Sequence, residues 1–209
     1  MTAPVTILGA GCTGPLLATL LAARGHRVRM YERRPDARRV ALPAGRSINL
    51  ALAARGIAAL ERAGLMDAVR PLLVPMPGRR VHDLDGTTRF LRYGQRPHET
   101  LYSVGRAELN RVLLAAAEAR GVEVLFEHAC EDADFDGDRL RMRDLAANRA
   151  YEIPMAPVIA ADGAGSAFRA AMVRAGLGTA REERLEHDYK ELTIPPAPGG
   201  GWRIDPGAL

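Results

Sequence analysis

The sequence predicts an α/β fold in which a parallel sheet with helices is combined with an antiparallel meander. Three observations support this prediction. An apolar segment at residues 5–8 runs directly into a glycine-rich turn, helical and extended patterns alternate after it, and residues 133–153 alternate short extended segments with turns. With 209 residues, the chain is long enough to bury a core as one large domain or two small ones.

The glycine-rich turn has the spacing G-x-G-x-x-G and contains Gly9, Gly11 and Gly14. Between a strand and a helix, the first glycine permits the tight turn and the second lets the backbone approach a pyrophosphate. The third allows the helix to pack closely on the sheet. Pro15 fits this interpretation, because proline is tolerated in the first turn of a helix. The motif therefore predicts a dinucleotide site at a helix N-terminus.

The residues after the turn complete a Rossmann-like strand–helix–strand unit. Leucines recur at helical spacing over residues 16–21, Gly25 follows the helix, and residues 28–31 form a second strand that ends at Glu32. An acid about 20 residues after such a turn accepts hydrogen bonds from a ribose hydroxyl. The alternative is a chance glycine turn beside an ordinary glutamate at a strand end.

The charge of the chain does not indicate a nucleic-acid site. The formal net charge is +4, and Lys190 is the only lysine, so almost all basic residues are arginines. They are interspersed with acids, as in Arg79, Arg80, Asp83 and the residues around them, and form no long basic run. We therefore expect no nucleic-acid partner.

Cysteine and histidine positions indicate neither a disulfide nor a metal site. Cys12 lies within the glycine turn and Cys130 follows a predicted strand, which is typical of a chain in a reducing compartment. We expect a cytoplasmic protein without a signal peptide, and no apolar stretch approaches the roughly 20 residues that cross a bilayer. The histidines lack ligand spacing; they are His26, His82, His98, His128 and His187.

The segment after Glu32 is predicted to be irregular before a second helix begins. Residues 33–45 are basic and contain prolines. Ser47 or Asn49 is expected to cap the alanine-rich helix that follows and runs towards Gly64.

A hairpin is predicted after residues 71–80, which are rich in proline and arginine. Extended segments at residues 81–84 and 88–93 flank the dipeptide formed by Asp85 and Gly86, which favours a tight reversal. The chain departs here from the parallel pattern.

The second half returns to alternating helix and strand patterns. Apolar residues recur on one face of a predicted helix at residues 106–120, and Gly121 is expected to end it. A strand is predicted at residues 122–126, the antiparallel meander at 133–153 and a further buried strand at 158–161.

The last predicted strand leads into Asp162 and Gly163, and this turn resembles the Asp-Gly fingerprint of the FAD-dependent aromatic hydroxylases. In that family, a G-x-G-x-x-G near the N-terminus, an arginine that opens a middle helix and the Asp-Gly turn occur in this order. Arg106 matches that arginine. Ala160 departs from the pattern, because the family usually has glycine there.

The resemblance covers essentially the whole chain and is most specific at residues 45–52. Further matches lie at residues 32–36, 103–110 and 189–192, and they favour the branch of the family that hydroxylates an aromatic amino acid next to a ring amine. Chains of this family continue well past the length of this one. The resemblance therefore implies an incomplete enzyme that is inactive alone.

The resemblance also implies how the chain is divided. Residues 1–70 and 101–180 would form a Rossmann-like FAD-binding domain of the aromatic-hydroxylase type that lacks its last segment. Residues 71–100 and 181–209 would form part of a β-rich substrate domain.

A resident FAD is implied, with contacts from both halves of the chain. The implied FAD-binding residues are Gly9, Gly11, Thr13, Gly14, Tyr31, Glu32, Arg33, Arg34, Ala51, Arg106, Cys130, Asp162 and Gly163. Each of these assignments has a non-functional alternative. Arg33 and Arg34 could be solvated surface residues, Cys130 a small core residue and Arg106 a charge on the helix surface.

For the substrate, the resemblance implies that Arg79 and Tyr93 hold the carboxylate of the amino acid, with NADPH as co-substrate and O2 as oxidant. A guanidinium offers a planar fork of donors to a carboxylate, and a phenol adds a directional hydrogen bond. The alternative is that Arg79 is one of many surface arginines and that Tyr93 is an aromatic side chain of the hairpin. The function also has alternatives, namely hydroxylation of another arylamine or a non-catalytic FAD-binding remnant, and the oligomeric state is open.

Overall fold

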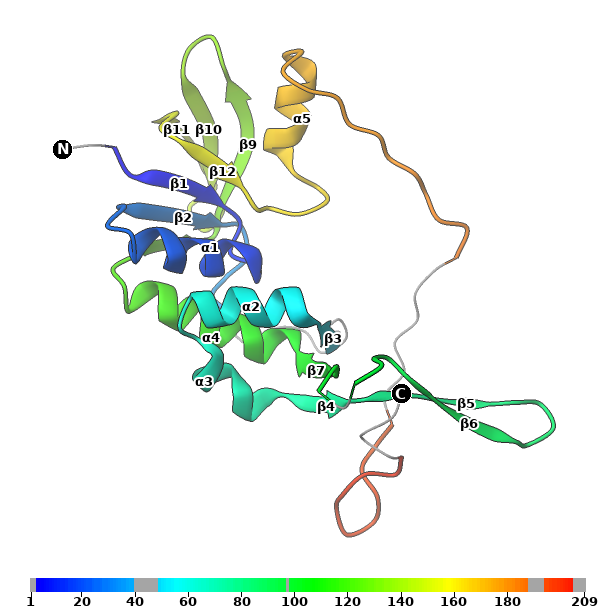
Figure 1. Ribbon diagram of the computed structural model, residues 1–209. Coiled ribbons are helices and arrows are strands. Elements are labelled where there is room, and N and C mark those ends of the chain that lie inside the picture. The colour runs from blue at the N-terminus through cyan, green and yellow to red at the C-terminus, as the bar shows by residue number, and fades with distance from the viewer. Residues whose placement is uncertain (1–2, 40–48, 97, 188–193, 205–209) are drawn as a thin grey trace. The chain divides into compact units, whose positions relative to one another are not determined.

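The computed structural model describes residues 3–39, 49–96, 98–187 and 194–204 (Figure 1). The chain divides into two compact units. Unit 1 contains Met1–Gly45 and Asn110–Glu183, and unit 2 contains Arg46–Leu109 and Arg184–Leu209. Helix α4, at Arg106–Glu118, begins in unit 2 and continues in unit 1.

Unit 1 contains a four-stranded sheet in the order β12-β1-β2-β8. All three neighbouring pairs are parallel, which confirms the predicted parallel sheet. Parallel neighbours need long crossover connections, and helix α1 provides the first of them between β1 and β2. The bounds are β1 (Val5–Leu8), α1 (Thr13–Ala22), β2 (Val28–Glu32), β8 (Glu123–Phe126) and β12 (Val158–Ala160).

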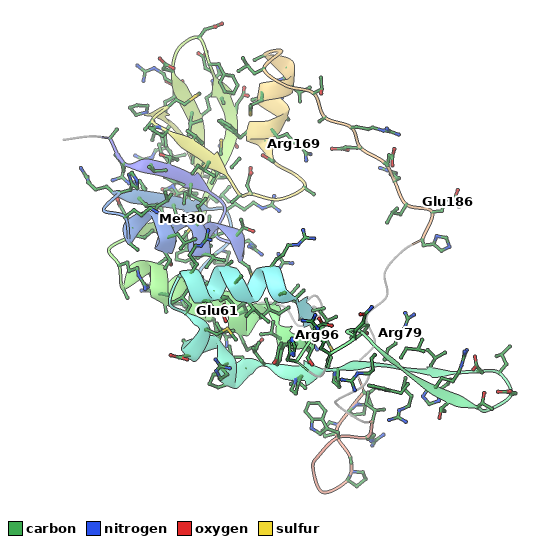
Figure 2. The ribbon with its side chains drawn as sticks, in the orientation of Figure 1. Met30, Glu61, Arg79, Arg96, Arg169 and Glu186 are labelled. Atoms are coloured by element: carbon green, nitrogen blue, oxygen red, sulfur yellow. The ribbon has the colours of Figure 1, made fainter. Side chains whose placement is uncertain are left out.

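The two faces of this sheet are covered by different layers, because side chains alternate along each strand. Ile7 and Met30 pack with α1 and the C-terminal part of α4 in one apolar core. Leu8 and Tyr31, their neighbours in sequence, pack with the antiparallel meander in a second core. Figure 2 shows Met30 on β2 beside α1.

The meander is a three-stranded antiparallel sheet in the order β11-β10-β9, as predicted. Leu140 and Met142 of β10 are completely buried and form the centre of its inner face. The first strand begins earlier than the predicted meander, so Cys130 lies within it. The strands are β9 (His128–Asp134), β10 (Arg139–Asp144) and β11 (Arg149–Pro154).

Helix α5 (Ala167–Arg174) packs against β9, and Figure 1 shows the two elements side by side. The ring of Phe168 meets that of Phe135 at a centroid distance of 5.6 Å. The Ser166 side chain caps the helix by accepting a hydrogen bond from the backbone N–H of Arg169 at 3.0 Å. The described chain after the helix, through residue 187, forms no helix or strand.

Unit 2 contains a small antiparallel sheet in the order β3-β7-β4, together with short helices. The predicted capping of its helix is wrong for Asn49, which is the first residue of β3 and pairs with Gly105. Ser47 lies outside the described residues. The bounds are β3 (Asn49–Leu52), α2 (Ala54–Arg62), α3 (Met66–Val69), the 3-10 helix η1 (Arg70–Leu72), β4 (Val74–Met76) and β7 (Leu101–Gly105).

The predicted hairpin is confirmed as β5 (Gly78–His82) and β6 (Thr88–Arg92), and it forms a two-stranded sheet of its own. Gly86 adopts a φ of +86° in the connecting turn, a conformation that favours glycine. Apolar side chains on this hairpin are exposed, including Phe90 and Leu91. A two-stranded ribbon without a packing partner is only marginally stable in water.

The boundaries of the two compact units differ from the domain boundaries expected from the sequence. Residues 46–70 and 101–109 fall in unit 2, whereas the sequence assigns them to the FAD-binding domain. Within the described residues, no helix has the length and apolar character needed to cross a membrane.

Candidate functional site

The glycine turn of unit 1 connects β1 to α1, and each of its glycines has a different neighbour. Gly9 has a φ of +95°, and a Cβ there would lie 2.6 Å from the carbonyl oxygen of Ala161. A Cβ on Gly14 would collide with the carbonyl oxygen of Gly9. Gly9 and Gly14 are therefore required by the fold itself.

Gly11 differs, because a Cβ there would meet no atom of the described structure within 4 Å. Packing within unit 1 gives no reason for a glycine at this position. The backbone at Gly11 is instead open to approach from outside. The first turn of α1 lies directly after it and contains no acidic residue, and Thr13 at the start of the helix is exposed.

Glu32 ends β2, and its carboxylate reaches back to the turn. It is only 5% exposed. Its Oε2 accepts a hydrogen bond from the N–H of Ala10 at 2.7 Å, and its Oε1 accepts bonds from the backbone N–H and the Nε of Arg34 at 2.9 and 2.8 Å. Burial raises the pKa of Glu32, but the hydrogen bonds from Arg34 and Ala10 outweigh it, so the pKa lies below its usual value. Glu32 is therefore a carboxylate at neutral pH.

The Asp-Gly turn after β12 lies beside the glycine turn, because β12 and β1 are parallel neighbours that end at the same edge. A Cβ on Gly9 would lie 2.7 Å from the Cα of Asp162. Gly163 has a φ of +85°. Cys130 on β9 belongs to the same region: burial and the carboxylate of Asp162 raise the pKa of its thiol to about 11. The structure thus brings together segments that are more than a hundred residues apart in sequence.

The predicted residues at the end of β2 and directly after it differ in their exposure. Tyr31 is 4% exposed, and its ring packs in the core near His128 at a centroid distance of 6.3 Å. Its backbone carbonyl accepts a hydrogen bond from Gly9 at 2.7 Å. Tyr31 therefore supports the turn through its backbone. Arg33 is exposed, and the side chain of Arg34 is half exposed while its Nε holds Glu32.

Two supporting interactions have no signal in the sequence. The Nδ2 of Asn110 on α4 donates a hydrogen bond to the carbonyl oxygen of Ala10 at 2.8 Å. Arg38 holds the segment after Glu32, because its guanidinium pairs with Asp36 at 2.8 Å and with Glu118 of α4. These contacts join residues up to 100 positions apart, and no local pattern predicts them.

The remaining predicted residues lie in unit 2. Ala51 is exposed on β3 opposite Ser103, and Arg106 is the exposed first residue of α4. Arg79 pairs with Leu91 in the hairpin, and the N–H of Tyr93 bonds the carbonyl of Pro77 at 3.0 Å.

Arg79 and Tyr93 lie on the same face of the hairpin. Leu91 lies opposite Arg79 on the partner strand, and Tyr93 lies two residues beyond Leu91. Side chains of directly opposite residues, and of residues two apart on one strand, point to the same face. Val81, Leu91 and Arg89 share that face, and the guanidinium of Arg89 is paired with Asp83. Figure 2 shows Arg79 projecting from the hairpin.

The strand, glycine turn, helix and buried acid of unit 1 define a dinucleotide-binding α/β protein. Comparison with known families specifies the dinucleotide. The model of the family described as "FAD binding domain" matches residues 2–186, so the chain belongs to this family, and FAD is its cofactor.

Curated relatives cover nearly the whole chain. Kynurenine 3-monooxygenase of Xanthomonas axonopodis pv. citri is 48% identical over 98% of this chain and 45% of its own length. The kynurenine 3-monooxygenase of Stenotrophomonas maltophilia is 44% identical with the same coverage. The chain thus spans less than half the length of the curated relatives that it matches.

Solved structures share the fold. The flavin-dependent monooxygenase PieE in complex with FAD and substrate has a TM-score of 0.69 at 20% identity, over 84% of this chain and 32% of that one. The p-nitrophenol 4-monooxygenase of Pseudomonas putida DLL-E4 has a TM-score of 0.66 at 23% identity, over 82% and 43%. The anhydrotetracycline hydroxylase of Streptomyces rimosus has a TM-score of 0.64 at 26% identity, over 83% and 34%.

Proposed function

We propose that this chain is the FAD-binding part of an NADPH-dependent monooxygenase that converts L-kynurenine to 3-hydroxykynurenine in tryptophan catabolism. The observation that carries the proposal is the 48% identity to a kynurenine 3-monooxygenase over 98% of the chain. Because the chain spans 45% of that relative, the activity is proposed for a protein of the relative's full length that contains this chain.

The residues of unit 1 fit the adenosine and pyrophosphate part of FAD. The backbone is open at Gly11, and the N-terminal turn of α1 offers N–H groups and a positive dipole end to an anion. An ionised carboxylate has about four lone-pair positions. Ala10 and Arg34 supply three donors to Glu32 within 3 Å, and the Nη2 of Arg34 is a fourth at 3.5 Å. The proposal is that a ribose hydroxyl takes the place of this longest contact.

The other predicted contacts complete the proposed cofactor site. Asp162 and Gly163 lie beside the glycine turn, and Cys130 adds a neutral thiol and backbone groups near Asp162. The proposal also assigns FAD contacts to Thr13, Tyr31 and Arg33 in unit 1. It assigns contacts to Ala51 and Arg106 in unit 2.

On the substrate side, we assign Arg79 and Tyr93 to the carboxylate of L-kynurenine. The hairpin register supports this assignment, because it puts both side chains on one face of the hairpin. The apolar residues Val81 and Leu91 lie on the same face. A guanidinium binds a carboxylate through two parallel hydrogen bonds, and a tyrosine adds one more.

Bound FAD would supply the redox chemistry, in which two electrons from NADPH reduce O2, one oxygen atom is inserted into a ring C–H bond of the substrate and the other leaves as water. The ring amine of L-kynurenine activates the adjacent carbon for this transfer. The protein residues bind and orient the reactants and exclude water, and the proposal requires no catalytic acid, base or metal. We further propose that the protein is cytoplasmic.

The test uses purified protein of the relatives' full length. We expect L-kynurenine to stimulate NADPH oxidation and 3-hydroxykynurenine to form. The 209-residue chain alone is expected to bind FAD weakly and to show no such turnover. Failure of L-kynurenine to stimulate a flavin-loaded protein, while another arylamine does so, would contradict the substrate assignment.

Arg79→Ala tests the proposed substrate residue in the same protein. We expect a rise of about tenfold or more in the KM for L-kynurenine, because a charged hydrogen-bonded pair is lost, with unchanged flavin content. The matched control is Arg80→Ala, the neighbouring position on the opposite face of the hairpin. Loss of flavin in the Arg79 variant would place this residue outside the substrate site.

A further inference from the structure

Asn110 combines with Glu32 to hold a single residue of the glycine turn from both sides. The N–H of Ala10 donates to Glu32 Oε2 at 2.7 Å, and the carbonyl oxygen of Ala10 accepts from Asn110 Nδ2 at 2.8 Å. Ala10 is 2% exposed, so both bonds lie in a closed environment, where an unmade bond is costly. We propose that Asn110 is a positioning residue that fixes the peptide between Ala10 and Gly11 and thereby aims the N–H of Gly11.

Covalent geometry links the carbonyl of Ala10 to the N–H of Gly11. The described residues contain no cis peptide bond, and in a trans peptide the C=O and the following N–H point in opposite directions. A carbonyl directed to Asn110 therefore directs the Gly11 N–H away from α4. Within the described residues, no hydrogen-bond acceptor contacts that N–H, and the side of Gly11 that a Cβ would occupy is open.

The turn needs such a restraint because of its glycines. Without side chains, Gly9 and Gly11 allow backbone conformations that other residues avoid, so rotation of the intervening peptides is sterically easy. A rotated Ala10–Gly11 peptide would present a carbonyl oxygen to an incoming anion in place of an N–H. The earlier peptides are already held by the sheet, through Gly9 to Tyr31 and Ala161 to Leu8. Asn110 restrains the last carbonyl before the open part of the turn.

This inference rests on the proposed role of the glycine turn in binding the FAD pyrophosphate. It predicts that Asn110 affects nucleotides that carry phosphate groups. It makes no use of NADPH or L-kynurenine, so its test is separate from that of the hydroxylase activity.

The test compares the FAD-free 209-residue chain with Asn110→Leu and Asn110→Asp, which keep the approximate size of the side chain and remove the donor. Hydrogen–deuterium exchange is measured by NMR. We expect the amide of Ala10, whose N–H is bonded to Glu32, to exchange about tenfold faster in both variants, while those of β1 and β2 are unchanged. Thr19→Val is the matched control, because Thr19 is a buried polar residue of α1 whose hydroxyl has no hydrogen-bond partner within the described residues.

Nucleotide binding is the second measurement. We expect the Kd values of FAD and ADP to rise together by about tenfold in both Asn110 variants and to stay unchanged in Thr19→Val. Unchanged exchange and unchanged Kd values would overturn the proposal. Faster exchange spread evenly over β1, β2 and α4 would also overturn it, because that result indicates a general structural role.

A third measurement applies if neither Asn110 variant folds. The side-chain amide protons of Asn110 in the unmodified chain should then exchange at least tenfold more slowly than those of a free asparagine side chain, and exchange at the free rate would overturn the proposal. If the unmodified chain binds no FAD, the role of the glycine turn fails, while the exchange data still decide whether Asn110 holds it.

Discussion

Glu32 is the residue in which the fold and the proposed site are most directly connected. A buried charge is costly unless it is paired and hydrogen-bonded, and this one receives bonds from Ala10 and Arg34. Its carboxylate therefore closes the glycine turn, and the proposed function adds a hydrogen bond from a ribose hydroxyl. The spacing from Gly14 predicts this residue from the sequence. The bond from Ala10 that fixes its orientation is visible only in the structure.

Glu32→Gln tests whether the charge of Glu32 stabilises the folded protein at neutral pH and loses this effect in acid. The folded pKa lies below the ordinary value of 4.5, so the charged group contributes stability above pH 4.5 that is lost as the pH falls through the folded value. We expect the variant to be destabilised by about 1–3 kcal/mol at pH 7, and the difference in thermal midpoint to shrink below pH 4.5. The control is Glu61→Gln, an exposed residue of α2. A constant difference between pH 7 and pH 3 would contradict the prediction.

Among the elements, local patterns predict the β1–α1–β2 unit and the meander, and they fail at β3. The first unit combines glycine spacing, leucine periodicity and a terminal acid, which all indicate the same structure. β3 has only four residues, and its pairing with β7 joins Asn49 to Gly105, far away in sequence. An alanine-rich segment that follows it favours a helix, so the sequence suggested a cap where a strand begins. Tertiary pairing decided this element.

Ser166 makes a testable contribution at the level of an element. Its Oγ accepts the hydrogen bond from the N–H of Arg169 and caps α5, which packs on the meander. We expect Ser166→Ala to lower the free energy of unfolding by about 1 kcal/mol, as measured by urea denaturation followed by circular dichroism. Ser166→Asp keeps an acceptor at the cap and should retain most of the stability. Equal losses in the two variants would show that the cap does not stabilise the helix.

At the scale of the whole molecule, the chain consists of two compact units, and the backbone passes between them three times: at residues 45–46, within α4 and after α5. The sequence predicts two regions of different character, but its boundaries assign residues 46–70 and 101–109 differently. Compactness depends on long-range contacts, whereas the sequence boundaries follow composition and motif order. The sequence-based domain division thus stays a prediction.

Limited proteolysis tests the segment after α5. Arg181 and Arg184 are exposed and lie where the described chain has no helix or strand, so a protease can bind the backbone without unfolding an element. We expect trypsin to cleave there before it cleaves at Arg143, which lies within β10, as followed by mass spectrometry. A first cut within the meander would contradict the described structure of this region.

The pairing of β1 with β12 has a consequence for synthesis on the ribosome. β1 is synthesised before β12, its neighbour in the sheet at Val158–Ala160. Until β12 has emerged, β1 has one unsatisfied edge, a feature that favours association with other chains. We therefore expect delayed folding or chaperone protection of β1 to reduce aggregation of the nascent chain.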